Sequence, residues 1–219
     1  MDTGPTSHLE TEQKYDADPG FTMPDLGALP GYSVAGTDRY ELSATYFDTA
    51  DLRLAANRIT LRRRTGGTDE AWHLKLPVRP GTRRELHLPL SEGTDTVPPQ
   101  MQAMVADVTG GAGLHPIALL DTTRTVRRLT SRDGEVLAEV ADDEVTARRL
   151  RPGPGAGQEG PSARAGGARE GQPMKWHEIE VELVSGPPTV LEVAGKLLRE
   201  AGARPSASAS KLGRLLAAD

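Results

Sequence analysis

Charged side chains recur at every second position in several segments that lie far apart in this sequence. These positions are Glu10, Glu12 and Lys14; Arg62 and Arg64; His73 and Lys75; and Glu178, Glu180 and Glu182. A period of two is that of a β-strand, in which successive side chains point to opposite faces. Each segment therefore predicts a strand with one charged face.

A charged strand face has two ordinary interpretations, because it can meet bulk water or line a polar lumen. For any single strand the solvent-facing interpretation is sufficient. On one open surface, however, rows of glutamates would repel each other and weaken pairing with acidic neighbours. Only 37% of the residues are hydrophobic and 4% are aromatic, whereas 26% are charged, and this composition suits a polar interior. Taken together, the strands indicate one lumen with an acidic wall and a basic wall.

Such a lumen suits a divalent metal together with a polyanion. Mg²⁺ typically takes one or two carboxylates plus substrate phosphates and keeps several waters. Arginine binds phosphate oxygens as a fork, and lysine binds them as a point charge.

The remaining elements are predicted from periodicity and turn residues. Strands are predicted at 8–15, 32–36, 41–48, 58–65, 70–78, 83–90, 122–131, 134–141, 143–150 and 176–184. Helices are predicted at 22–29, 100–108 and 188–201 and from about 208 to the end, the last with Ser208 or Ser210 as its N-cap. Residues 1–7 are expected to form a flexible tail, and 8–219 one domain in which the Gly- and Pro-rich segment 152–173 is a disordered loop. Many short strands with a few helices indicate an α+β fold dominated by one antiparallel sheet.

Several classes of site are excluded or disfavoured. The chain has no cysteine, which removes disulfides, thiolate metal sites and cysteine nucleophiles. Its five histidines show no HxxxH or HExxH spacing, so a histidine zinc site is not expected, and no P-loop motif is present. A formal net charge of −5 argues against a sequence-specific nucleic-acid partner. Without a signal peptide or a membrane-spanning run, a cytoplasmic location with no membrane contact is expected.

Six short motifs stand in a fixed order along the chain. They are Glu10-Thr11-Glu12-Gln13-Lys14, Tyr46-Phe47-Asp48-Thr49, Leu61-Arg62-Arg63-Arg64, Trp72-His73-Leu74-Lys75-Leu76-Pro77, His177-Glu178-Ile179-Glu180-Val181-Glu182-Leu183 and Ser210-Lys211-Leu212. Together they resemble the motifs of the CYTH family, also called triphosphate tunnel metalloenzymes, whose hallmark is E-x-E-x-K. The resemblance extends from about residue 8 to residue 216.

The resemblance implies a closed antiparallel eight-stranded β-barrel, or tunnel, with a few flanking helices. It also implies a metal cofactor, Mg²⁺ or Mn²⁺, held by Glu10, Glu12, Glu178 and Glu180, with Glu182 as a further candidate. The phosphate-side cations that it implies are Lys14, Arg62, Arg64, Lys75, Arg124 and Lys211. Either Asp142 or Asp143 matches an acidic position of the family, and the register leaves both open. Tyr46 and Phe47 are expected to pack in the barrel wall.

Members of the family hydrolyse inorganic triphosphate, thiamine triphosphate or RNA 5′-triphosphate ends, and one branch makes cyclic AMP from ATP. The resemblance therefore implies metal-dependent hydrolysis of a triphosphate-containing substrate, inorganic triphosphate above all, with Glu12 and Lys14 as catalytic residues. Either a second metal activates the attacking water, or Lys14 acts as general base, since a lysine among cations can have a depressed pKa.

An alternative from a different class is a non-catalytic polyphosphate-binding module, either a stand-alone protein or the N-terminal part of a CYTH–CHAD protein. The expected partners are thus inorganic triphosphate, polyphosphate or an organic triphosphate, together with a CHAD domain or protein.

Overall fold

The fold is built around one antiparallel sheet that closes on itself. The structure, a computed structural model, describes residues 5–90, 95–151 and 169–218. The strands are β1 (Thr6–Ala17), β2 (Ser33–Asp48), β3 (Thr60–Thr65), β4 (Ala71–Arg79), β5 (Thr82–Pro89), β6 (His115–Thr130), β7 (Val136–Arg151), β8 (Arg169–Glu170), β9 (Met174–Leu183) and β10 (Arg204–Pro205). The helices are the 3₁₀ turn η1 (Leu26–Ala28), α1 (Arg53–Ala56), α2 (Pro99–Met104), α3 (Ala106–Thr109), α4 (Thr189–Glu200) and α5 (Lys211–Leu216).

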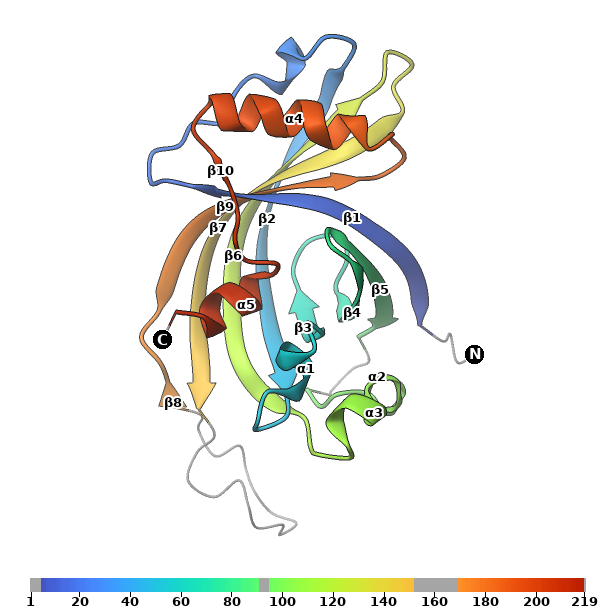
Figure 1. The fold of residues 1–219 in the computed structure, drawn as a ribbon, viewed down its shortest axis with the longest axis vertical. Coiled ribbons are helices and arrows are strands. Elements are labelled where there is room, and N and C mark those ends of the chain that lie inside the picture. Colours follow the sequence, from blue (N-terminus) through green and yellow to red (C-terminus); the bar gives the residue numbers. More distant parts are fainter. Residues whose placement is uncertain (1–4, 91–94, 152–168, 219) are drawn as a thin grey trace.

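Eight strands form a ring in the order β1-β5-β4-β3-β2-β6-β7-β9, and β9 pairs back to β1 (Figure 1). The first half of β1 pairs with β5 through Thr6–Thr11, and the second half pairs with β9 through Glu12–Ala17. One long strand thereby joins the two ends of the sheet. The predicted tunnel of eight antiparallel strands is confirmed, and the ring closes where the second half of β1 pairs with β9.

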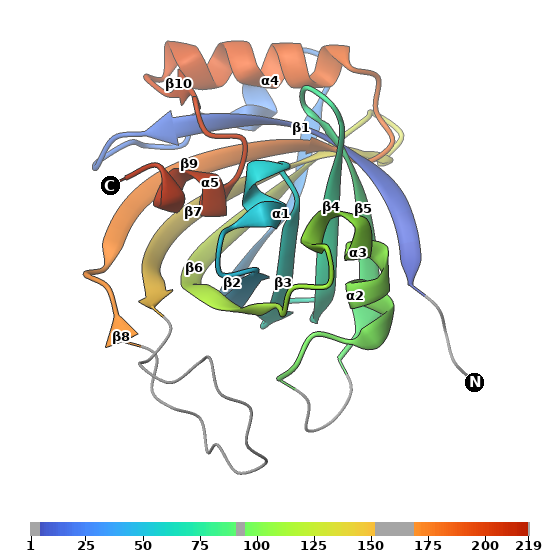
Figure 2. The same cartoon turned by 60° about the horizontal axis from the view of Figure 1, so that its bottom comes forward.

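The apolar core lies mainly outside this ring. α4 packs on β1, β7 and β9 through a cluster that includes Val190, Leu191 and Leu198 (Figure 1). α2 and α3 lie beside β4 and β5 (Figure 2). A buried cluster that includes Leu61 and Trp72 also takes in Leu54 of α1 and Met101 of α2. Because side chains alternate across a strand, the residues between these core positions project into the ring.

α5 lies on the concave side of β6, β7 and β9 (Figure 1). Its Leu212 and Leu215 pack against small and apolar residues of β6 and β7. The Ser210 hydroxyl accepts a hydrogen bond from the backbone of Gly213, which confirms Ser210 as the N-cap. This placement brings Lys211, the first residue of the helix, into the ring interior.

Three long strands differ from the shorter ones predicted. β2 is continuous where the sequence predicts separate strands at 32–36 and 41–48, because it pairs with β6 over its whole length and absorbs a bulge between Ala35 and Thr37. β6 starts at His115 rather than at 122, and β7 is one strand rather than two. Pairing with neighbours on both sides keeps these strands extended beyond what their local pattern indicates.

The predicted helix at 22–29 shrinks to the single turn η1, with Asp25 as its cap, because Pro24, Gly27 and Pro30 interrupt it. The helix predicted at 100–108 is divided into α2 and α3 at Val105. The helix predicted at 188–201 is confirmed as α4.

Two predicted flexible segments are partly ordered. Thr6 and Ser7, assigned to the tail 1–7, belong to β1 and pair with β5. Arg169 and Glu170, assigned to the loop 152–173, form β8 against β7. Residues 1–4 and 152–168 lie outside the described residues. Among the described residues, the helices fall short of the length and apolar character that a membrane crossing requires.

Candidate functional site

The ring encloses a charged cavity of about 190 Å³. Nine of the predicted site residues line it: Glu10, Glu12, Lys14, Arg62, Arg64, Lys75, Arg124, Glu180 and Lys211. The tenth, Glu178, is only 3% exposed and contacts Lys211 beside the cavity. The structure thus brings all the predicted residues together, from strands that are far apart in sequence.

Strand register explains this convergence. Residues that are paired directly across neighbouring strands form rows. One row crosses β2, β3, β4 and β5 and consists of Tyr46, Arg62, His73 and His87; the next crosses β3, β4, β5 and β1 and consists of Thr60, Lys75, Glu85 and His8. On the other side of the ring the rows are Arg124, Asp143 and Glu178, and Glu139, Glu182 and Glu12. A period of two keeps every member of these rows on the inner face.

Five of the inner residues, two cations and three carboxylates, form a closely ion-paired group, which we call the paired cluster: Arg124, Asp143, Glu178, Glu180 and Lys211. Lys211 Nζ lies 2.8 Å from Asp143 and 2.7 Å from both Glu178 and Glu180. Arg124 donates to both oxygens of Asp143 at 2.8 and 2.6 Å and to Glu180 at 2.6 Å. Burial alone would lower the pKa of Lys211, yet the three carboxylates raise that pKa well above its usual value.

A second group is less well compensated, and we call it the open group: Glu10, Glu12 and Glu182 on one side and Arg62 and Arg64 on the other. Glu10 contacts Lys75 Nζ at 2.6 Å, and Glu12 contacts Lys14 Nζ at 2.8 Å. Glu182 makes no ion pair within the described residues. Burial and the nearby carboxylates, Glu10 first, raise the pKa of Glu182 to about 8.

The basic side of the open group has unused hydrogen-bond donors. Arg62 Nη1 donates to the Tyr46 hydroxyl at 3.2 Å, and Arg64 contacts Asp69. The Nε atoms of both arginines are buried and have no hydrogen-bond partner among the described residues. Burial, together with the charges of Arg62 and Arg124, lowers the pKa of Arg64 to about 9. An anion in the cavity would supply the missing acceptors and relieve this repulsion.

Lys14 differs from the sequence-based interpretation. It lies between Glu12 and Glu180 rather than among cations. Burial alone would lower the pKa of Lys14, but these carboxylates outweigh burial and raise it above its usual value. The prediction that Lys14 has a depressed pKa, on which its role as general base depends, is therefore wrong. The side chain stays positively charged at neutral pH.

Several lining residues were missed or left undecided by the sequence. Asp143 is buried beside the cavity against Arg124 and Lys211, whereas Asp142 contacts His177 on the other face of β7, which favours Asp143 as the acidic position. Tyr46 lines the cavity instead of only packing in the wall. Glu85 and His87 also line it, and their spacing of two on a predicted strand was the available signal.

Comparison with known proteins places this geometry in a family. The model of the CYTH domain family matches residues 8–215. Two uncharacterised proteins of Mycobacterium tuberculosis, MT2285 and Rv2226, are each 38% identical over 221 aligned residues, which cover 98% of this chain. The same alignments cover 41% of each relative, so the chain spans about two fifths of their length.

Solved structures share the fold. A putative adenylate cyclase from Bacillus halodurans superposes with a TM-score of 0.62 at 18% identity, covering 95% of this chain and 97% of that one. HpAC1 from Hippeastrum, described as a putative adenylyl cyclase with a dominant triphosphatase activity, superposes with a TM-score of 0.54 at 18% identity and covers 95% of both chains. At this identity the likeness establishes the fold alone.

Proposed function

The chain belongs to the CYTH domain family, and from this premise we propose that it binds a triphosphate chain in the ring cavity and hydrolyses it with the help of a divalent metal. Inorganic triphosphate is the proposed substrate. A protein of the same fold, HpAC1, is described as having a dominant triphosphatase activity, which supports this choice of reaction.

The observation that carries the proposal is the pair of buried guanidinium groups in the open group. Arg62 and Arg64 each have a buried Nε without a hydrogen-bond partner among the described residues. A buried donor without an acceptor costs about 1–3 kcal/mol, and more when it is charged. Phosphate oxygens fit this fork geometry and its charge. Lys75 and Lys14 lie on the same cavity and would hold further oxygens of the chain.

The acidic side fits a hard divalent ion. Glu10, Glu12 and Glu182 offer only carboxylate oxygens, the donors that Mg²⁺ and Mn²⁺ prefer. They face two lysines, each of which also contacts another carboxylate. Glu178 and Glu180 are already engaged by Lys211. We therefore propose that the metal binds at Glu10, Glu12 and Glu182, with Glu180 beside them. Asp143, Glu178 and Glu180 have carboxylate oxygens within 4.8 Å of one another, but Lys211 already contacts all three.

The residues have separate roles in the proposed reaction. A water oxygen forms a bond to the terminal phosphorus as the bridging P–O bond breaks, which releases phosphate and diphosphate. A bound Mg²⁺ or Mn²⁺ would supply positive charge against the phosphate oxygens. Arg62 and Arg64 would fix the chain and bind the charge that shifts toward the leaving oxygen. Lys14, held by Glu12 and Glu180, would contribute charge rather than accept a proton.

Phosphate release from inorganic triphosphate, measured with and without Mg²⁺ or Mn²⁺, tests the proposal. Glu12→Ala and Lys14→Ala should each lower kcat/KM by about 10²-fold or more, because each removes a charge next to the reacting phosphates. Wild-type rates in both variants, or hydrolysis that does not depend on metal, would rule the scheme out.

A second candidate function, binding of long polyphosphate without turnover, is favoured by an adjoining cavity of about 440 Å³. It shares Glu12, Lys14 and Arg83 with the ring cavity and adds Arg58 and Arg79, which continue the row of cations beyond the length of a triphosphate. A binding assay with long polyphosphate beside the phosphate-release assay separates the two functions. Tight binding without release supports the binding module, and release from triphosphate supports the enzyme.

A further inference from the structure

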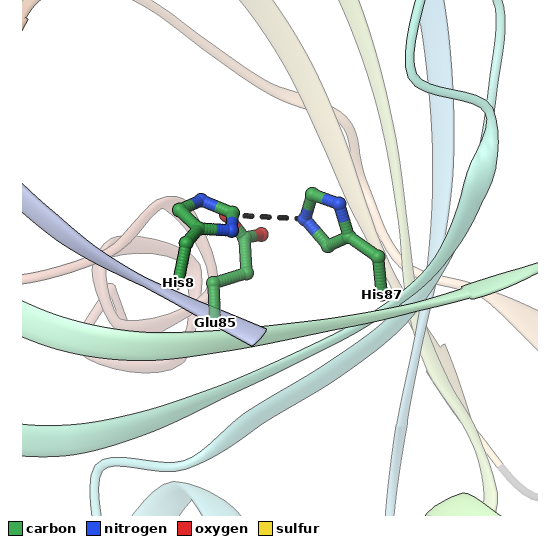
Figure 3. A group of neighbouring side chains, drawn as sticks. All are labelled: His8, Glu85 and His87. Carbon is green, nitrogen blue, oxygen red and sulfur yellow. Dashed lines mark ion pairs between the residues drawn. The ribbon is translucent and has the colours of Figure 1, made fainter. Parts of the chain in front are cut away.

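A second set of metal-ligating side chains lies in the ring, apart from the all-carboxylate side of the open group. It consists of His8 on β1 and of Glu85 and His87 on β5. His8 is directly opposite Glu85 in the strand register, and His87 follows Glu85 on the same face of β5. Figure 3 shows the two imidazoles on either side of the Glu85 carboxylate.

The distances between these donors suit one metal ion. His87 Nε2 lies 3.3 Å and His8 Nε2 lies 3.5 Å from Glu85 Oε2. One ligand atom from each residue lies within 4.8 Å of the others. Tetrahedral zinc with bonds of about 2.0–2.1 Å holds neighbouring donors roughly 3.3 Å apart. The side chains thus need only small movements to surround an ion.

The Glu85 carboxylate is held in place by its other oxygen. Oε1 contacts His73 Nδ1 at 3.0 Å and Lys75 Nζ at 3.4 Å. His73 is 1% exposed, and its Nε2 lies 3.0 Å from the Asp69 carbonyl oxygen, so the ring lies between two acceptors and its neutral form donates to one of them. Oε2 is thereby turned toward His8 and His87. Ligating carboxylates in metal proteins are oriented by hydrogen bonds of this kind.

The His87 nitrogen is buried and His8 is the solvent-facing member of the cluster. His87 Nε2 is buried and has no hydrogen-bond partner among the described residues beyond its 3.3 Å contact with Glu85. Side-chain exposure rises from 7% at Glu85 to 25% at His87 and 47% at His8. An ion can therefore enter past His8 and keep a coordination position open to water.

We propose that His8, Glu85 and His87 form a transition-metal site, with Zn²⁺ as the best-fitting ion, distinct from the carboxylate site for Mg²⁺ or Mn²⁺. Two imidazole nitrogens and one carboxylate oxygen select zinc-like ions over Mg²⁺. Lys75 lies between the two sites, since its Nζ contacts Glu10 at 2.6 Å and Glu85 at 3.4 Å. The site does not depend on triphosphate hydrolysis, because none of its ligands belongs to the open group.

Calorimetric titration of the metal-stripped full chain with Zn²⁺, and the visible absorption of the chain with Co²⁺, test the site. We expect one strong Zn²⁺ site per chain and a Co²⁺ spectrum typical of nitrogen ligands. His8→Ala and His87→Asn should each weaken Zn²⁺ at least tenfold. His8 is half exposed, so its truncation should leave the fold intact, which circular dichroism checks.

Two matched controls make the outcome decisive. His115→Ala removes an exposed histidine outside the cluster and should leave Zn²⁺ binding unchanged. Glu12→Gln should weaken Mn²⁺, detected by electron paramagnetic resonance, while leaving Zn²⁺ affinity within about twofold of the wild-type value. The proposal is overturned if the wild-type chain shows no strong Zn²⁺ site or if His8→Ala and His87→Asn both bind Zn²⁺ as tightly as the wild-type chain. It is also overturned if Glu12→Gln weakens Zn²⁺ binding as much as these two variants do.

Discussion

The paired cluster and the open group lie inside the same ring, yet their charges are arranged differently. In the paired cluster, Lys211 and Arg124 lie 2.6–2.8 Å from oxygens of three carboxylates. Glu178 Oε1 is the one carboxylate oxygen of this cluster among the buried atoms without a hydrogen-bond partner in the described part of the chain. In the open group, Arg62 and Arg64 keep buried donors without acceptors, and Glu182 makes no ion pair among the described residues, although the charge of Lys75 acts on it. Charges that satisfy one another hold the fold together, whereas charges left unsatisfied are available to a ligand. Removing charges from each group should therefore have different consequences.

The largest expected effect is on stability, in the paired cluster. Asp143→Ala should lower the free energy of unfolding by about 3–5 kcal/mol, because it leaves Arg124 and Lys211 buried with less compensating charge. Asp143 is fully buried. Urea denaturation measures the loss, and Asp121→Ala, at a carboxylate whose side chain is 48% exposed, should cost less than about 1 kcal/mol. Equal losses in the two variants would remove the distinction between a structural cluster and an ordinary ion pair.

In the open group the expected effect is on binding. Arg62→Met keeps the apolar stem and removes the guanidinium, which should weaken triphosphate binding by about 10–100-fold while leaving stability unchanged or raised. Arg63→Met is the matched control, since Arg63 Nε is likewise buried without a hydrogen-bond partner among the described residues but Arg63 does not line the cavity and lies toward the exposed Asp95. Calorimetric titration with triphosphate measures both affinities. If Arg62→Met mainly destabilised the fold, Arg62 would belong with the paired cluster.

A pH effect is expected at Glu182. Its pKa of about 8 exceeds the ordinary value of 4.5, so the folded state binds this proton more tightly than the unfolded state does. Stability should therefore fall as pH rises from about 4.5 to 8, by at most about 1.4 kcal/mol per pH unit from this group. Screening should reduce the total to about 1–2 kcal/mol.

Glu182→Gln should remove the part of the decrease in unfolding free energy with pH that comes from Glu182. Urea denaturation at several pH values, in the presence of a chelator, measures this dependence. Glu192→Gln, on the helix α4, controls for a general change of charge and should leave the slope as it is. A variant slope identical to that of the wild-type chain would show that the acidic side of the open group is already compensated.

The smallest effect is expected outside the cavity, at His177. Its hydrogen bond with Asp142 raises the pKa of His177 above 6.5. The pair therefore stabilises the fold fully below about pH 6.5, and this contribution disappears as pH rises through the higher folded-state pKa. His177→Gln should cost less than about 1 kcal/mol at pH 6 and still less at pH 9. Thermal unfolding at the two pH values measures the difference, and a larger loss at pH 9 would contradict it.

The sequence by itself determined which residues share a strand face. The alternation of Glu10, Glu12 and Lys14 and of Glu178, Glu180 and Glu182 follows from the pleat of the strand, a local property that needs no knowledge of neighbours. The amphipathic pattern of 188–201 likewise identified α4. Motif order then supplied the family and, with it, the residues that the ring brings together.

Tertiary structure alone decided which of these faces meet. Strand register between β5, β1 and β9 placed His8 against Glu85, although their separation in sequence shows no zinc spacing. The position of α5 inside the ring brought Lys211 to Asp143 and the glutamates, and the neighbours of Lys14 turned out to be carboxylates rather than cations. A pKa or a metal site depends on the distances between side chains. These distances are set by pairing between residues up to 170 positions apart in the sequence, and a local periodic pattern does not determine such pairing.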